Sequence, residues 1–242
     1  MRRAASIFVW ILVLAVPAIA PRAAQGQTAR VIDRIVARIE GDIILLSQVR
    51  ELGAFQQLVE GHAETDDVLL TKLIEQWIVQ TEATESRFPQ PAQTEVDREL
   101  ARLVGQFKTP DALADKLREL GLTAAQVRRM IARQIFIGRY IDYKFRPTVQ
   151  IESAEIGKYY QNELLPELAE KNQPQSKGLQ AEPLTHLGGL QAEPTPVPRL
   201  AEVEAQIREL LTQRAITELA TKWLDETKPR LKIELTPTDA KP

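Results

Sequence analysis

The stretch VIDRIVARIEGDIILLSQVRE, from Val31 to Glu51, decides the fold that we expect for this chain of 242 residues. Apolar and polar side chains alternate up to Ile39, the chain reaches the turn-forming run Glu40-Gly41-Asp42, and the alternation then resumes. A period of two is typical of half-buried strands, and a short glycine-containing turn between two such runs predicts a β-hairpin. A helix is expected to begin directly afterwards, at Ser47.

A second alternating run, RLKIEL, lies near the other end of the chain, from Arg230 to Leu235. No neighbouring segment has the pattern of a strand with which it could form a hairpin. A lone strand leaves a row of unpaired backbone groups, so it needs a partner strand elsewhere in the protein. We therefore expect this run to join the N-terminal hairpin, so that the two ends of the protein close on each other.

The sequence between the hairpin and the closing strand has a mainly helical pattern. Apolar residues recur at helical spacing, as at Leu70, Leu73, Ile74 and Trp77, which is typical of a buried helical face. The expected helices run over about 47–60, 65–87, 94–107, 109–120, 123–146, 153–165 and 200–225. The predicted fold class is mainly α: a helical bundle with a small N-terminal β-hairpin completed by a C-terminal strand.

Helix ends are marked by capping residues and prolines. Thr123 followed by Gln126 forms the capping-box pattern, and Thr94 followed by Asp97 is interpreted in the same way. Pro166 is expected to disturb the end of the helix that begins near residue 153.

The helix expected over 123–146 is apolar on two sides. Aliphatic residues such as Ile131 lie on one side, and at about 100° per residue Phe136, Tyr140 and Tyr143 gather on the opposite side. Two interpretations follow. Either the aromatic side packs against another helix of the same chain, or it forms a surface for a partner.

Residues 172–199 differ in composition from the helices around them. They contain five prolines and a direct duplication, GLQAEP at 178–183 and again at 189–194. We interpret this segment as a flexible linker between an N-terminal helical domain, 27–171, and a C-terminal helix and strand, 200–242. The C-terminal helix is expected to pack through one apolar stripe: Leu200, Val203, Ile207, Leu210, Leu211, Leu219, Ala220 and Trp223.

The first 26 residues have the pattern of a signal peptide. Two arginines follow Met1, an uncharged run from Ala4 to Pro21 comes next, and candidate cleavage sites lie between Ala20 and Gly26. The apolar run is shorter than the roughly 20 residues of a membrane-spanning helix and it contains Pro17. We therefore expect an exported protein with no membrane span after cleavage.

Charge and cysteine content exclude several classes of protein. Residues 1–26 hold three arginines and no acidic residue, so the chain after cleavage has 28 Lys and Arg against 33 Asp and Glu, a formal charge of -5. A mildly acidic protein is a poor candidate for nucleic-acid binding, which requires a basic face. The absence of cysteine excludes disulfides, a thiolate nucleophile and a cysteine metal site.

Five segments, taken together and in this order, carry a likeness to a known family. They are VIDRIVARIEGDIILLSQVRE (31–51), LLTKLIEQWIVQTEA (69–83), QTEVDRELARL (93–103), GLTAAQVRRMIARQIFIGRYI (121–141) and PRLAEVEAQIRELLTQRAITELATKWLDETKPRLKIEL (198–235). This chain resembles the SurA family of periplasmic chaperones over essentially all of residues 27–242 except the linker. The resemblance implies an N-terminal helical domain that is completed by a distant C-terminal helix and strand.

Most members of that family also carry parvulin-type prolyl isomerase domains before the C-terminal helix. Such a domain needs on the order of 100 residues. Fewer than fifty residues separate Ile151 from Leu200 here, and the two histidines of the chain, His62 and His186, do not form a parvulin-like pair. The sequence also has no P-loop, no G-x-G-x-x-G, no H-E-x-x-H and no nucleophile-elbow motif. We therefore expect no enzyme activity, no catalytic residue, no metal site and no cofactor.

The resemblance implies an ATP-independent holdase of the periplasm that binds unfolded outer-membrane β-barrel precursors. Aromatic side chains suit the alternating strands of such clients, so the candidate peptide-binding residues are Phe136, Tyr140, Tyr143, Tyr159 and Tyr160. Packing within the protein is the competing interpretation for each of them. Two alternative functions stay open: a prolyl isomerase with a reduced domain, and an assembly protein dedicated to one folded partner.

Overall fold

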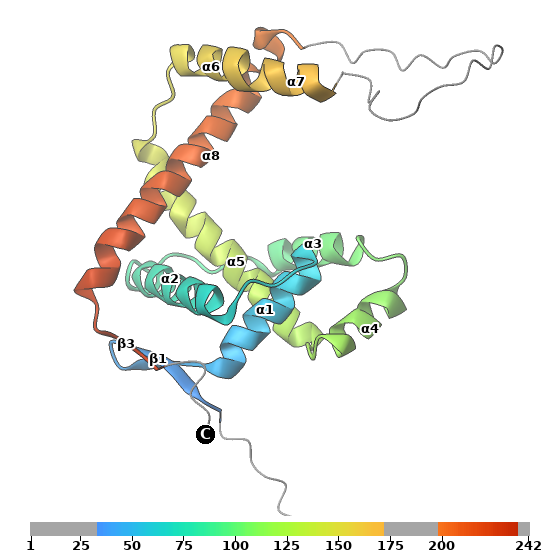
Figure 1. Cartoon of the computed structure of the whole chain (residues 1–242), viewed down its shortest axis with the longest axis vertical. Coiled ribbons are helices and arrows are strands. Elements are labelled where there is room, and N and C mark those ends of the chain that lie inside the picture. Colours follow the sequence, from blue (N-terminus) through green and yellow to red (C-terminus); the bar gives the residue numbers. More distant parts are fainter. Residues whose placement is uncertain (1–32, 172–197, 237–242) are drawn as a thin grey trace, which may run out of the picture. The chain divides into compact units, whose positions relative to one another are not determined.

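The computed structural model describes residues 33–171 and 198–236, which form a mainly helical structure with one small sheet (Figure 1). The expected signal peptide and nearly all of the expected linker lie outside the described residues. The elements are β1 (Ile35–Ile39), β2 (Asp42–Leu45), α1 (Leu46–Glu60), α2 (Asp66–Glu85), α3 (Gln93–Val104), α4 (Pro110–Glu119), α5 (Ala124–Phe145), η1 (Arg146–Thr148), α6 (Ser153–Tyr159), η2 (Tyr160–Leu164), α7 (Leu165–Lys171), α8 (Leu200–Thr227), η3 (Lys228–Arg230) and β3 (Ile233–Leu235). None of these helices is long and apolar enough to cross a membrane.

The sheet joins the N-terminal hairpin to the C-terminal strand, which confirms the closure predicted from the sequence (Figure 1). Its strand order is β2-β1-β3, and both pairs are antiparallel. Ile39 lies opposite Ile233, and the Thr236 N–H donates a hydrogen bond of 2.9 Å to the Val36 carbonyl oxygen. Strand β1 is therefore the central strand and has a partner on each edge.

The hairpin turn consists of Glu40 and Gly41, both with positive φ, +50° and +102°. A two-residue turn of this kind matches the right-handed twist of the flanking strands. Glu40 is a costly residue at positive φ because of its Cβ atom. Its contacts to the C-terminal segment offset that cost: its N–H donates to the Lys232 carbonyl oxygen at 3.2 Å, and its carboxylate accepts from the Lys232 N–H at 2.7 Å.

The main hydrophobic core is built from β1, β2 and helices α1, α2, α3 and α5. Its most deeply buried side chains are Val36, Ile39, Val49, Leu69 and Val127. Leu231 and Ile233, from the C-terminal end, pack against this core and are half-buried. The closing strand therefore contributes apolar side chains to the core as well as backbone hydrogen bonds.

Helix α8 contacts both α5 and α6. Its buried residues Ile207 and Ile216 are nine positions apart, two and a half turns, so they lie on opposite sides of the helix. Arg208 donates to the Ile151 carbonyl oxygen at 2.8 Å, and Lys228, just beyond the helix, donates to Glu75 of α2 at 2.6 Å. The helix thus buries two different stripes instead of the single stripe expected from the sequence.

The capping interpretation is confirmed for α5 and wrong for α3. Thr123 and Gln126 form the expected capping box. Helix α3 begins one residue earlier than expected, at Gln93, and the carboxylate of Glu95 accepts the Ala92 N–H at 2.8 Å. Asp97 is not free to cap the helix because it forms an ion pair with Arg128 of α5.

Pro166 does not end its helix, because the turn before it is widened. Residues Tyr160–Leu164 form a π-helix between α6 and α7, and the Leu165 N–H donates to the Tyr160 carbonyl oxygen. Proline has no N–H to donate, and a local π-turn lets the helix continue past the missing hydrogen bond. The helical segment therefore extends to Lys171.

Truncation after Arg230 should lower the free energy of unfolding by about 2–4 kcal/mol, since the two half-buried side chains and the β1–β3 ladder are lost. Urea denaturation followed by circular dichroism measures this change. Truncation after Thr236 is the matched control and should leave the midpoint unchanged, because it retains every described β1–β3 contact. Equal midpoints for the two truncated proteins would show that β3 does not stabilise the sheet.

Candidate functional site

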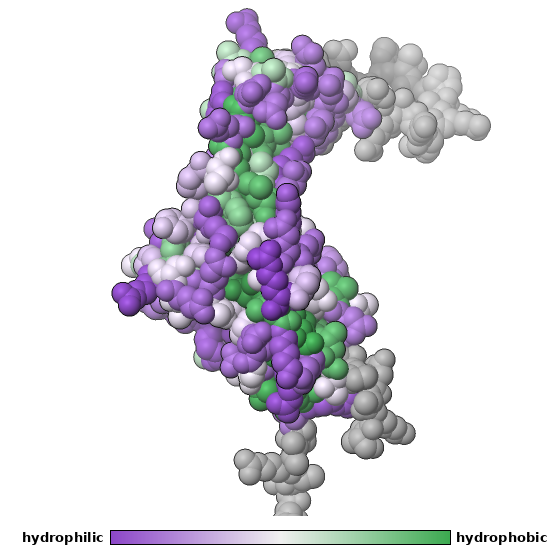
Figure 2. Space-filling view, turned by 90° about the vertical axis from the view of Figure 1, so that its left-hand side faces the viewer, coloured by the Kyte–Doolittle hydropathy of each residue, from purple (hydrophilic) through white to green (hydrophobic). Residues whose placement is uncertain are grey.

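The surface of the described protein carries scattered apolar residues among hydrophilic ones. From the side shown in Figure 2, apolar patches reach the surface between charged and polar side chains. The exposed large apolar residues of the described ranges are Ile43, Val59, Val68, Val104, Tyr143, Leu200, Leu210 and Leu235. Of the five aromatic residues predicted from the sequence to bind peptides, only Tyr143 belongs to this set.

Phe136 and Tyr140 lie in the protein interior, with 5% and 3% of their surface exposed. They form a second core cluster with Val79 and Ala83 of α2. The ring of Phe88, from the connection between α2 and α3, lies 5.8 Å from the Phe136 ring and 5.3 Å from the Tyr140 ring. These contacts correct the prediction for both residues: the aromatic side of α5 packs within the chain there, and neither residue is available at the surface.

The Tyr140 hydroxyl group has polar partners in this interior position. It donates to the carboxylate of Glu82 at 3.2 Å and lies 3.5 Å from the Ser86 hydroxyl oxygen. Lys144 forms an ion pair with the same Glu82 carboxylate. A buried tyrosine needs such a partner for its hydroxyl group, so the arrangement supports a structural role for Tyr140.

Tyr143, Tyr159 and Tyr160 have three different environments. Tyr143 is 65% exposed, with its ring 5.3 Å from that of Phe88. Tyr159 is half-buried, and the Arg214 guanidinium carbon lies 5.0 Å from the centroid of the Tyr159 ring. The Tyr160 hydroxyl donates to the Pro198 carbonyl oxygen at 2.8 Å, which fastens η2 to the segment before α8. Only Tyr143 has most of its surface open to solvent.

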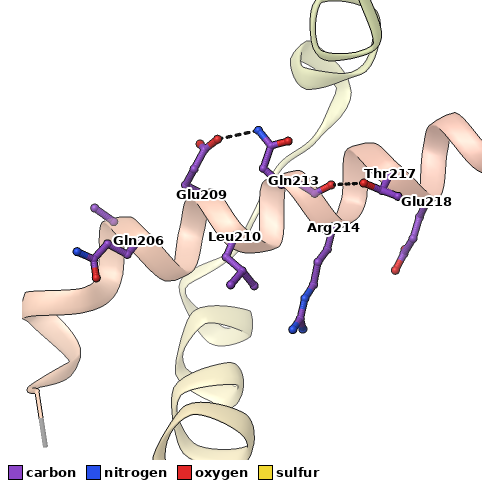
Figure 3. Close-up of a pocket in the computed structure, with 8 residues that line it drawn as sticks. Gln206, Glu209, Leu210, Gln213, Arg214, Thr217 and Glu218 are labelled. Carbon is purple, nitrogen blue, oxygen red and sulfur yellow. Dashed lines mark hydrogen bonds between the residues drawn. The ribbon is translucent and has the colours of Figure 1, made fainter. Parts of the chain in front are cut away.

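A concave surface with a volume of about 950 Å³ lies along α8. We call it the α8 groove. Its described lining residues form two rows at i, i+4 spacing along one helix: Ala205, Glu209, Gln213 and Thr217, and Gln206, Leu210, Arg214 and Glu218. Figure 3 shows Glu209 and Gln213 hydrogen-bonded to each other, with Leu210 and Arg214 projecting from a different side of the helix.

The wall of the α8 groove is mostly apolar although most of its lining residues are polar. Leu210 contributes a side chain that is 38% exposed, and long polar side chains present their aliphatic stems. The sequence pattern had assigned Leu210 to the buried stripe, and its exposure corrects that assignment. Leu210 and Leu211 are adjacent, so they lie about 100° apart and one helix face does not bury both equally.

Two charged residues of the α8 groove are paired with neighbouring helices. Glu209 accepts two hydrogen bonds from Arg146, at 2.8 and 2.9 Å, and one from Gln213 at 2.8 Å. The Arg146 and Gln213 hydrogen bonds lower the pKa of Glu209 to about 2. Arg214 donates to Glu163 of η2 at 2.8 Å, which raises the pKa of Arg214. These pairs reduce the net charge that the groove presents to a bound molecule.

No three His, Asp or Glu side chains within the described ranges are arranged to hold a metal ion. The α8 groove offers apolar contact area with amide and hydroxyl groups beside it. This chemistry suits non-covalent contact with an extended apolar or amphipathic segment.

Tyr140→Ala should destabilise the protein by about 2–4 kcal/mol, because it leaves a cavity in the second core cluster. Tyr143→Ala should cost less than about 1 kcal/mol, since most of that side chain is in water. Chemical denaturation of the two variants measures the difference. Equal losses would contradict the assignment of Tyr140 to the core and of Tyr143 to the surface.

Acid should weaken the contribution of Glu209 to the contact between α5 and α8. Because its folded-state pKa is lowered from 4.5 to about 2, its contribution is fully present above pH 4.5 and is lost as the pH falls toward 2. Thermal unfolding of the parent and of Glu209→Gln should therefore differ at neutral pH and converge in acid. The effect should be small and salt-sensitive, since the pair is exposed.

Glu218→Gln is the matched control, because Glu218 lines the same groove without a hydrogen bond or ion pair to another described residue. This variant should follow the parent protein at every pH. A constant difference between Glu209→Gln and the parent across the acid range would contradict the assigned role of the carboxylate.

No protein-family model and no curated protein matches this chain. The likeness to the SurA family therefore stays a prediction from the sequence pattern. A fold alone does not determine a protein's function, which depends on the chemistry of its surface.

Proposed function

We propose that the protein is an ATP-independent chaperone that holds unfolded polypeptides at the α8 groove. The observation on which this proposal depends is an open, mostly apolar concavity along an exposed helix face, in which Glu209 and Arg214 are paired with residues of other elements. Such a surface gains free energy from burying apolar side chains of many different sequences, and a promiscuous binder needs this tolerance.

The one-sided lining of the groove favours a chain segment over a small molecule. Its volume of about 950 Å³ lies within the roughly 300–1,000 Å³ that is usual for ligand pockets, so the volume alone does not decide between them. A pocket for a small molecule encloses most of its ligand, whereas the described lining of this groove comes from α8 alone. An extended segment can lie along the helix, bury some of its side chains and leave the others in water.

The attachment of α8 supports the same proposal. At its C-terminal end, Lys228 donates a hydrogen bond to the Glu75 carboxylate. Toward its other end, Arg208 donates a hydrogen bond to the Ile151 carbonyl oxygen. A helix fixed at both ends keeps its apolar surface in place, which lowers the entropy cost of ordering the site when a client binds.

The likeness to periplasmic chaperones and the signal-peptide pattern suggest where the protein acts and on what. We propose export to the periplasm and unfolded outer-membrane β-barrel precursors as the client class. Strands of such precursors alternate apolar and polar side chains, so one side of an extended strand is apolar. That pattern is complementary to a groove with an apolar wall and polar side chains beside it.

Light scattering of an unfolded β-barrel protein, diluted with and without this protein and without nucleotide, tests the proposal. Near-stoichiometric suppression of aggregation is expected. Leu210→Glu should raise the concentration for half-maximal suppression about tenfold, because it replaces an apolar contact of the groove with a charge.

Leu200→Glu is the matched control for this substitution. Leu200 lies on the same helix outside the groove, with 36% of its surface exposed against 38% for Leu210. This variant should suppress aggregation as the parent does. No suppression by the parent protein would contradict the chaperone proposal, and equal effects of the two substitutions would place the binding surface elsewhere.

A further inference from the structure

A second concave region lies where the hairpin, α1, α2 and α5 meet. Two hollows of about 100 and 200 Å³ adjoin there and share Gln48, Leu73 and Arg133 as lining residues. We call this region the arginine cleft. It is smaller and more enclosed than the α8 groove, and it is built from four elements instead of one.

Apolar side chains form part of the inner wall of the arginine cleft and are fixed in position. Leu73 and Met130 are buried side chains of the main core, and Ile44 of β2 is buried beside them. Trp77 forms part of one side, and its indole N–H donates to the Asp42 carboxylate at 2.9 Å, which holds the ring in place. The wall can therefore receive an apolar side chain of limited size.

Cationic groups of α5 line the same cleft. Arg129 and Arg133 are four residues apart, so they lie on the same face of the helix about one turn from each other. Arg133 is exposed and forms no hydrogen bond or ion pair with any residue in the described ranges. The Arg129 guanidinium group lies 3.9 Å from the Glu51 carboxylate, which is its one acidic partner in the described ranges. The charged lining residues of the cleft are Arg129, Arg133 and Glu51, which together carry one net positive charge.

Neutral hydrogen-bond donors accompany the arginines. The Gln48 side-chain oxygen accepts the Leu45 N–H at 2.8 Å, so the amide NH₂ group of Gln48 remains as a donor. Gln76 and Gln80 of α2 line the same hollow as Arg133. An anion placed there meets a guanidinium group and amide donors, while an apolar group attached to it contacts the inner wall.

We infer that the arginine cleft binds the C-terminal carboxylate of a client polypeptide whose last residue is apolar. This inference rests on the proposed chaperone function. A terminal carboxylate and the side chain of the same residue are attached to one Cα atom, which matches a cation beside a small apolar hollow. A side-chain carboxylate of Asp or Glu has no apolar group at that position.

Fluorescence anisotropy with a labelled alternating peptide that ends in phenylalanine tests the inference. The peptide is prepared as the free acid and as the C-terminal amide. The free acid should bind about fivefold more tightly, because a hydrogen bond to a charged group is lost in the amide. Arg133→Gln should remove this preference, and Arg133→Lys should retain part of it, since lysine keeps the charge without the fork of donors.

Arg98→Gln is the matched control, because Arg98 is an exposed arginine of α3 outside the cleft with no partner among the described residues. It should leave the preference unchanged. Circular dichroism and thermal unfolding establish that each variant is folded.

Equal affinity for the free-acid and amide peptides overturns the inference that the cleft binds a terminal carboxylate. A preference for the free acid that remains in Arg133→Gln overturns it as well. Suppression of aggregation in the scattering assay together with equal peptide affinities leaves the chaperone proposal standing without the anchor. If the protein does not suppress aggregation and the peptide affinities are equal, both the chaperone proposal and the carboxylate inference are overturned.

Discussion

The pairing of β3 with β1 is the constraint on which the rest of the structure depends. Strand β1 has Val36, Ala37 and Ile39 fully buried, and without β3 one edge of this central strand would lie open. An open edge of a buried apolar strand is a template for pairing with another chain, and β3 covers that edge here. The same pairing fixes the C-terminal end of α8, because only a few residues separate the helix from the strand.

That fixed end determines how α8 uses its surface. The helix buries Ile207 and Ile216 on opposite sides, and ion pairs from Arg146 and Glu163 reach it from neighbouring elements. The strip of α8 between these two buried sides stays exposed, includes Leu210, and forms the groove.

The local sequence pattern was sufficient to predict most of the helices and strands. Most of the features that it did not predict depend on contacts between residues far apart in the chain. The hairpin turn at Gly41 and the cap at Thr123 depend on residues a few positions apart, so the sequence displays them directly. The position of Phe88 over Tyr140 and the pairing of Asp97 with Arg128 join residues far apart in the chain. Periodicity identified an apolar side of α5, but it does not contain the information about what covers that side.

In the proposed function, the α8 groove and the arginine cleft have different roles in binding a client. A groove with paired charges binds many sequences weakly, so it does not determine where along a client the protein attaches. A cleft that binds a terminal carboxylate is also insensitive to most of the client's sequence. It nevertheless selects one site on the client, because each chain has a single C-terminus. Two weak contacts on one client raise its overall affinity through effective concentration, provided that the client spans both sites. Promiscuity and a defined point of attachment are then compatible in a single small protein.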